Sequence, residues 1–291
     1  MKRSVWNVAL SGLKCHSTVF FMAIALSGSA CAHERIFDVH ANVEITRDAL
    51  IEVLSSSEEV IVGEKHDTAS IQNAEAKLFS DYARVRKERI TLAWEFWNWS
   101  EKAALDSAYA KFQRDKITGQ EFMNGVFGGK NSEPTYVRLI EAAKAAGADV
   151  LATNLTREEK ATVTRGGLGA LNPSLLPPGF ELGDANYLER FTAAMGGHGA
   201  PAISNYFAAQ SLVDDVAAMH VARDRSTLSV FLVIGCFHTR YFGGVWQRMV
   251  KRSPGKSLTL IEIADSGDET DWETIMHDPK YGAVADYLIL E

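Results

Sequence analysis

Two apolar runs in this chain end in the same pattern, Gly-x-x-His. The first run, Val60–Gly63, leads to His66, and the second, Phe231–Gly235, leads to His238. Uninterrupted runs of apolar, largely β-branched residues are typical of strands that are buried on both faces of a parallel sheet. Glycine lets the backbone turn sharply where such a strand ends. Each histidine is therefore predicted just beyond the carboxyl end of a buried strand, which is where α/β proteins place functional residues.

A third strand-like run, Ile90–Glu95, also ends on an ionisable side chain. Because the carboxyl ends of parallel strands meet at one edge of a sheet, His66, Glu95 and His238 are expected to converge on one crevice. The alternative is that each is an ordinary strand-end residue whose side chain bonds only to loop backbone. A polar side chain at a half-buried strand end costs free energy unless it is paired. The repeated pattern therefore favours a shared site.

Strand-like and helical segments alternate through most of the chain. The predicted strands cover residues 35–39, 60–62, 90–95, 149–153, 228–234, 257–264 and 286–290, and the predicted helices cover 47–54, 69–86, 101–114, 135–146, 187–195 and 204–223. The alternation stops at about residues 156–226, where no strand pattern occurs. The expected fold class is α/β, with a mainly parallel β-sheet flanked by helices and a smaller α-helical subdomain inserted in it.

The first 32 residues are typical of an export signal. Lys2, Arg3 and Lys14 form a basic start, Val19–Leu26 is an apolar run, and Ser27–Ala32 supplies the small residues that a signal peptidase requires. The apolar run is shorter than the roughly 20 residues that a membrane-spanning helix needs. We therefore expect this segment to be removed, which leaves residues 33–291 as the mature domain.

Two processing routes fit the end of this segment. Ala30-Cys31-Ala32 matches an A-x-A cleavage site that would release a soluble periplasmic protein starting at His33, whereas Gly28–Cys31 resembles a lipobox in which Cys31 becomes lipidated. We favour the second route. It predicts a protein attached to a membrane through a lipid anchor on Cys31.

Charge and cysteine content exclude several classes of protein. Loss of the three basic residues of the signal would lower the net charge from −7 to −10. A protein this acidic, without a basic stripe, is not expected to bind nucleic acid. Beyond the signal Cys236 is the one remaining cysteine, so the mature chain has no internal disulfide, no Cys-x-x-Cys-His haem attachment motif and no cysteine-rich zinc site.

The residues at the strand ends suggest two kinds of chemistry. His66 and His238, with carboxylates from Glu64, Asp67 or Glu95, would suit an open zinc or manganese site. Without a metal, either histidine could act as a general base with Glu95 as its partner. Both alternatives describe a hydrolase of esterase or peptidase type.

Six segments, in order along the chain, carry a resemblance to a known family. They are Gly63–Asp67, Trp94–Phe96, Ala152–Arg157 with Arg165–Leu168, Ala209–Met219, Gly235–Val245 and Ala285–Leu290. Together they resemble the ChaN family of haem-binding, iron-regulated bacterial lipoproteins, which belongs to the Tiki/TraB and erythromycin-esterase-like superfamily. The resemblance covers about residues 35–291. It implies the same parallel sheet with a helical subdomain.

The resemblance also implies a non-covalent haem and a homodimer that holds two stacked haems. In the family each iron is bound by a tyrosine, with a histidine of the partner chain nearby, and tyrosinate is a sound ligand for ferric haem. The candidate haem-binding residues in the helical subdomain are Tyr187, Tyr206 and His198. Of the two tyrosines, Tyr187 is the preferred iron ligand. The expected function is therefore that of an exported haem-binding protein rather than an enzyme.

Such a protein would act in haem or iron uptake or handling in the bacterial cell envelope, with an outer-membrane haem or iron receptor as a partner. The hydrolase that uses His66, Glu95 and His238 remains the alternative.

Overall fold

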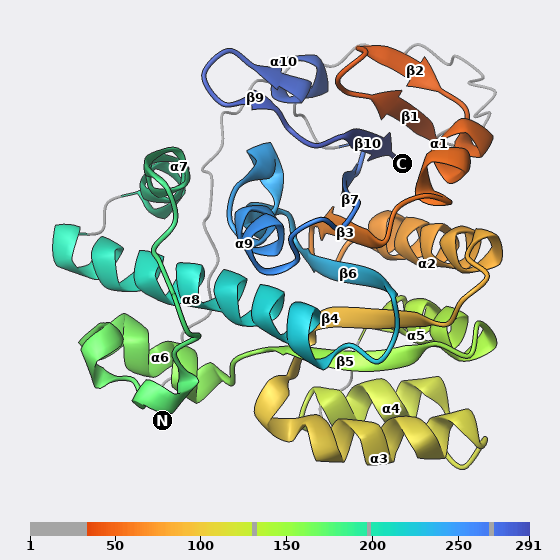
Figure 1. The fold of residues 1–291 in the computed structure, drawn as a ribbon, viewed down its shortest axis with the longest axis horizontal. Coiled ribbons are helices and arrows are strands. Elements are labelled where there is room, and N and C mark those ends of the chain that lie inside the picture. The colour runs from red at the N-terminus through yellow and green to blue at the C-terminus, as the bar shows by residue number, and fades with distance from the viewer. Residues whose placement is uncertain (1–33, 130–132, 197–198, 268–270) are drawn as a thin grey trace, which may run out of the picture. The chain divides into compact units, whose positions relative to one another are not determined.

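An eight-stranded sheet forms the centre of the structure, a computed structural model that describes residues 34–129, 133–196, 199–267 and 271–291 (Figure 1). The strand order is β2-β1-β10-β7-β3-β6-β4-β5. The strands are β1 (Arg35–Asp38), β2 (Val43–Ile45), β3 (Glu59–Glu64), β4 (Ile90–Asn98), β5 (Asp149–Asn154), β6 (Ser229–Gly235), β7 (Leu258–Ala264) and β10 (Tyr287–Leu290). All neighbours from β10 to β5 are parallel, and β1 pairs antiparallel with β10 and β2. The predicted mainly parallel sheet is confirmed.

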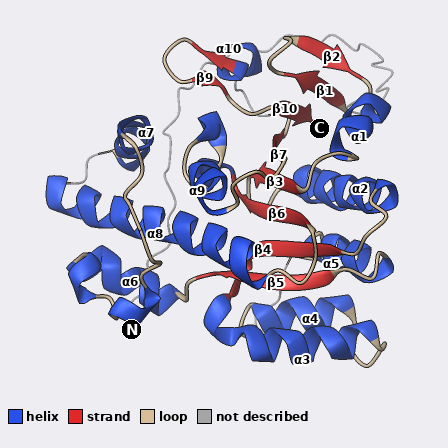
Figure 2. Ribbon diagram, in the orientation of Figure 1, coloured by secondary structure: helices blue, strands red, loops and turns tan. Residues whose placement is uncertain are grey.

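Helices cover both faces of this sheet, and a separate two-stranded ribbon pairs β8 (His277–Asp278) with β9 (Gly282–Ala283) (Figure 2). The helices are α1 (Arg47–Leu54), α2 (Ala69–Val85), α3 (Lys102–Gln113), α4 (Gly119–Val126), α5 (Tyr136–Ala145), α6 (Arg157–Gly166), α7 (Ala185–Met195), α8 (Ala200–Asp224), α9 (Val245–Arg252) and α10 (Trp272–Met276). The sequence gives clear local reasons for several boundaries. Thr46, for example, caps α1 by accepting a hydrogen bond from the Ala49 backbone N–H at 3.2 Å.

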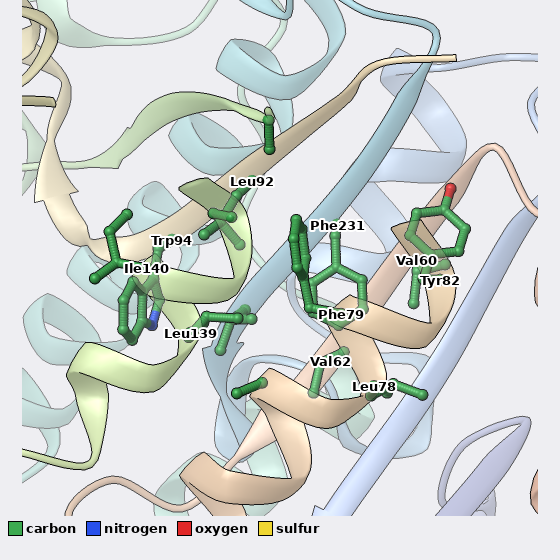
Figure 3. Packing of buried hydrophobic residues seen from close by; sticks show 14 of the residues in the cluster. Val60, Val62, Leu78, Phe79, Tyr82, Leu92, Trp94, Leu139, Ile140 and Phe231 are labelled. Carbon is green, nitrogen blue, oxygen red and sulfur yellow. The ribbon is translucent and has the colours of Figure 1, made fainter. Parts of the chain in front are cut away.

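Side chains that alternate along the strands divide the core into two layers. On one face, strand residues such as Val60, Leu92 and Phe231 pack against α1 to α5 (Figure 3). On the other face, strand residues such as Ile61 and Leu232 pack against α8, α9 and α10. Neighbouring residues of one strand point to opposite faces. The continuous apolar runs are therefore buried on both sides, as the sequence predicts.

The described residues between β5 and β6 include no strand and form α6, α7, α8 and short 3-10 turns, with a loop over residues 176–184 before α7. Its longest helix, α8, has two halves with different partners. The carboxyl-terminal half packs on the sheet through Ala217, Ala218 and Val221. The amino-terminal half extends beyond the strands between α6 and α7 (Figure 1). The helical insertion is thus continuous with the α/β body through α8.

Removal of the Phe231 ring is expected to destabilise the protein by about 3–5 kcal/mol, because the cavity adds to the loss of buried apolar surface. Phe231 is fully buried, with its ring centroid 5.2 Å from that of Phe79. Urea unfolding of Phe231→Ala measures the loss. Val250→Ala is the control, since Val250 is 51% exposed, and should change the free energy of unfolding by less than about 0.5 kcal/mol. Equal values for the two variants would contradict this packing.

Candidate functional site

His66, Glu95 and His238 meet at the carboxyl edge of the sheet, as expected from the sequence. His66 follows β3 and His238 follows β6, whereas Glu95 lies within β4, which continues to Asn98 instead of ending at residue 95 as predicted. Glu95 comes directly after Trp94, the last residue of β4 that pairs with β6, and β3, β6 and β4 are consecutive strands of the sheet. His66 Nε2 lies 3.6 Å from Glu95 Oε2, and His238 Nε2 lies 3.7 Å from Glu95 Oε1. We refer to these three residues as the rim cluster. The geometry shows a shared site and does not by itself assign its role.

Each histidine of the rim cluster is oriented by a second carboxylate. His66 Nδ1 lies 2.5 Å from Glu64 Oε1, and His238 Nδ1 lies 2.7 Å from Asp214 Oδ1. Glu64 and Asp214 are buried, so they fix the rings firmly. A carboxylate on one ring nitrogen sets the orientation of the other, and in both rings Nε2 is directed toward Glu95. Asp214, on α8, is a functional neighbour that sequence reasoning missed.

The glycine of the second Gly-x-x-His motif lies against Glu95 and His66. The Gly235 backbone N–H donates a 2.7 Å hydrogen bond to Glu95 Oε2. A Cβ atom at Gly235 would lie 3.4 Å from both Glu95 Oε2 and His66 Nε2. This separation is close to ordinary van der Waals contact, so the end of β6 packs directly against the two side chains without strain.

Gly63, in the first motif, is more restricted. A Cβ atom there would lie 2.2 Å from Thr239 Oγ1 and 2.4 Å from Glu262 Oε2. Both contacts are far too short for real atoms, so a larger residue would displace the turn that follows β6. The two glycines therefore serve close packing around the strand ends.

Both histidines bind their protons more tightly than a free imidazole. Burial alone would lower the pKa of His238, but the charges of Asp214 and Glu95 outweigh it and raise this pKa above its usual value. Burial also opposes protonation of His66, while Glu64 and Glu95 raise the pKa of His66 overall. Nearby carboxylates favour the charged imidazolium. The rim cluster therefore carries more positive charge near neutral pH than two free histidines would.

Glu95 is the ionised centre of this arrangement. Burial raises the pKa of Glu95, but the charges of His238 and His66 and the Gly235 N–H together lower this pKa below its usual value. The positive charge of Lys160, on α6, also lowers the pKa of Glu95. Burial lowers the pKa of Lys160, although the charge of Glu95 opposes this shift. Glu95 thus stays negative although only 14% of its side chain is exposed, because cations and a backbone donor compensate for the lost hydration.

A further carboxyl group, Glu75 of α2, lies behind Glu64. Glu75 is fully buried, and neither of its oxygens accepts a hydrogen bond from a donor in the described part of the chain. Burial and the charge of Glu64 raise the pKa of Glu75 well above its usual value. The raised pKa favours the protonated, neutral form of Glu75. Sequence reasoning missed it because it lies on the buried face of α2, where most of the other side chains are apolar.

The metal alternative finds no support in the geometry. Within residues 34–129, 133–196, 199–267 and 271–291, no group of three or more His, Cys, Asp or Glu side chains could hold a metal ion. Asp67 instead accepts a 2.9 Å hydrogen bond from the Tyr136 hydroxyl. Burial raises the pKa of Cys236 to about 12, so that thiol stays protonated.

Tyr187 and Tyr206, the tyrosines expected to bind haem, lie in very different environments. Tyr187 is fully buried, and its hydroxyl accepts a 3.0 Å hydrogen bond from Gln210 Nε2. Burial and the charge of Asp214 raise the pKa of Tyr187 well above its usual value, which opposes a phenolate. Tyr206, on α8, is 38% exposed. Accessibility therefore favours Tyr206 over Tyr187, the reverse of the order expected from sequence.

Three other sequence-based predictions concern segments that the structure leaves undescribed. His198, Cys31 and the export signal of residues 1–32 lie outside the described residues. In the described part of the chain, no helix has both the length and the apolarity that a membrane span requires.

The fold and the site define a class: an α/β protein with an ionisable cluster at the carboxyl edge of its sheet and a helical insertion that presents a tyrosine. A model of the haem-binding uptake family, Tiki superfamily, ChaN, matches residues 50–249. The chain belongs to this family. The predicted family and its cofactor, haem, are confirmed at this level. No curated protein matches the chain.

Two solved structures resemble this one. The structure that reports cofacial haem binding to ChaN of Campylobacter jejuni has a TM-score of 0.69 and 16% sequence identity, and the match covers 88% of this chain and 96% of that one. This likeness shows the same fold. The structure of the type III effector HopBA1 has a TM-score of 0.44 and 15% identity, with 84% of this chain and 91% of that one covered.

Replacement of Asp214 by asparagine is expected to lower the pKa of His238, because burial then acts with less opposing charge. In the wild type, protonated His238 stabilises the fold fully below about pH 6.5, the usual pKa of an unfolded histidine, and this contribution is lost as the pH rises through the raised pKa. NMR titration of the His238 ring measures the pKa.

Urea unfolding across the same pH range measures the matching loss of stability. Asp48→Asn is the control, since Asp48 is an exposed acidic residue of α1. An unchanged pKa of His238 in Asp214→Asn would contradict the electrostatic account of the rim cluster.

Proposed function

We propose that this chain binds haem non-covalently on its helical insertion, with the Tyr206 oxygen as the iron ligand, and that it acts in haem uptake or handling. Family membership supports haem as the ligand. The choice of Tyr206 as the iron ligand rests on the contrast between the exposed Tyr206 and the buried Tyr187. Bound haem would supply a ferric iron, for which a phenolate oxygen is a suitable axial ligand.

The segment of the chain that contains Tyr206 exposes other large apolar side chains. Half of the eight exposed large hydrophobic side chains among the described residues lie between residues 176 and 206: Leu176, Leu182, Leu188 and Tyr206. Exposed apolar side chains on the helical insertion favour an apolar ligand for this part of the chain. A porphyrin laid on this part of the insertion would remove apolar surface from water.

The proposal also covers how the protein assembles and where in the cell it acts. Haem binding is described as cofacial for the Campylobacter jejuni protein, and we propose that two copies of this chain likewise bring two haems face to face. His198, which follows α7 in the chain, would approach the haem of the partner copy. Export through residues 1–32 and a lipid anchor on Cys31 would hold the protein in the bacterial cell envelope, within reach of an outer-membrane haem or iron receptor.

The rim cluster supports a second candidate, a hydrolase. His66 and His238 each pair with a buried carboxylate, an arrangement that suits a general base. The His66 side chain is 40% exposed, so a substrate could reach it. The family supports the haem-binding function rather than this alternative.

Hemin titration of purified protein is expected to give the absorption spectrum of ferric tyrosinate haem. Tyr206→Phe should lose this spectrum and weaken binding by about tenfold or more, which corresponds to 1.4 kcal/mol. Tyr187→Phe is the matched control and should keep the spectrum, although loss of its hydrogen bond to Gln210 should cost about 1 kcal/mol of stability. Loss of the spectrum in Tyr187→Phe alone would overturn the assignment of Tyr206.

The second candidate is tested by an esterase and peptidase screen that compares the wild type with His66→Ala. If the rim cluster is not catalytic, both proteins should show the same background rates. A wild-type activity that falls by about 100-fold or more in His66→Ala, the usual contribution of a general base, would instead establish a hydrolase.

A further inference from the structure

Arg190 of α7 lies among four aromatic rings. Its guanidinium carbon is 5.3 Å from the ring centroid of Tyr187, 6.0 Å from that of Phe237, 5.1 Å from that of Tyr241 and 5.8 Å from that of Tyr281. A guanidinium over aromatic faces is attracted by the negative face of each ring. These contacts hold the cation in place but satisfy none of its hydrogen-bond donors.

The donors of Arg190 are unused within the described residues. No described residue forms a hydrogen bond or ion pair with Arg190, and its Nε is buried without an acceptor. Other partly or fully buried arginines bond to carboxylates or to backbone and amide oxygens: Arg47, Arg86, Arg225, Arg240, Arg248 and Arg252. A buried donor without an acceptor costs free energy. Arg190 is therefore suited to receive an acceptor from outside the chain.

The turn beside Arg190 follows a strained backbone path. Tyr241 and Phe242 have φ values of 58° and 54°, and Gly244 has a φ of 48°. Positive φ is uncommon for residues other than glycine, and such strain gathers at functional sites. At Gly243 a Cβ atom would lie 2.5 Å from Arg190 Nη2. The absence of a side chain at Gly243 leaves the space that the guanidinium occupies.

The carboxylates that flank Arg190 on α7 are engaged elsewhere. Asp184 caps the helix by accepting a 2.7 Å hydrogen bond from the Tyr187 backbone N–H, and it also binds Gln247. Glu189 binds Lys280 and accepts a 3.2 Å hydrogen bond from the Tyr281 hydroxyl. Burial lowers the pKa of Arg190, although the charges around it partly offset this. Within the described part of the chain, the guanidinium therefore has no ion pair with a carboxylate, although the charge of Asp184 reaches it.

We propose that Arg190 binds a carboxylate through the fork of its guanidinium. The planar fork matches a carboxylate with two parallel hydrogen bonds, and the aromatic walls would keep water from competing for it. A haem propionate and a small free carboxylate offer the same chemistry. The propionate case rests on the proposed function, since α7 packs on α8 through Phe191 and Phe207 and α8 carries Tyr206.

Comparison of hemin with haem dimethyl ester tests the propionate directly. Esterification removes the negative charges and leaves the porphyrin and iron unchanged. Wild-type protein should bind hemin about tenfold or more tightly than the ester, because a charge-assisted pair is worth more than a neutral one. Arg190→Gln should lose this preference, and Arg190→Lys, which keeps the charge without the fork, should retain part of it.

Arg138→Gln is the matched control, because Arg138 is an exposed arginine of α5, and it should keep the full preference. A preference for hemin that survives in Arg190→Gln would overturn the propionate assignment. Thermal unfolding of each variant shows whether the fold is retained, and Arg190→Lys provides the comparison if Arg190→Gln fails to fold.

A second readout does not depend on haem. The Arg190 Nε–H signal, identified in an NMR spectrum by its loss in Arg190→Lys, should move when sodium propionate is added and should not move with sodium chloride. If wild-type protein fails to bind hemin, the proposed function fails, and movement of this signal still establishes a carboxylate site. If the signal does not move and hemin and ester bind equally, the inference is overturned.

Discussion

The negative charge of Glu95, a largely but not fully buried residue of β4, is the constraint on which the rest of the site depends. A buried carboxylate is costly unless charges and donors surround it, and Glu95 has His66 and His238 on either side and the Gly235 N–H at 2.7 Å. The two histidines follow β3 and β6, and Gly235 ends β6, the strand that lies between β3 and β4 in the sheet. The two Gly-x-x-His motifs therefore supply the groups that make an ionised Glu95 stable.

The same constraint links the sheet to the helical insertion. Asp214 binds His238 from α8, and Gln210, one turn earlier, lies within 3.1 Å of His238 Nδ1 and donates to the Tyr187 hydroxyl. Tyr206 precedes Gln210 by one further turn of the same helix. The proposed haem ligand thus sits on a helix whose position is fixed at the rim cluster. On this account His66, His238 and Tyr187 support the haem site without touching the ligand.

Periodicity and strand-end chemistry are sufficient to predict the parallel sheet and the meeting of His66, Glu95 and His238, because both follow from local sequence. Contacts between distant segments cannot be predicted in this way. Glu75 and Asp214 lie on the buried faces of helices, among mostly apolar residues, so the sequence pattern does not single them out. Arg190 gains its aromatic neighbours only when α7 packs against the turn at residues 240–242. The burial of Tyr187 likewise depends on α8. Helices α4 and α6 were not predicted, because they lack a broad apolar stripe. The capping boxes at Thr118 and Thr156 could have indicated where these helices begin.

The most direct test of the central claim is the crystal structure of the protein with hemin, with the iron located by its anomalous scattering. The account predicts iron bonded to the Tyr206 oxygen on the helical insertion, with His66 and His238 still facing Glu95. Iron bonded to His66 or His238 at the edge of the sheet would contradict it, because the rim cluster would then be the ligand site rather than its support.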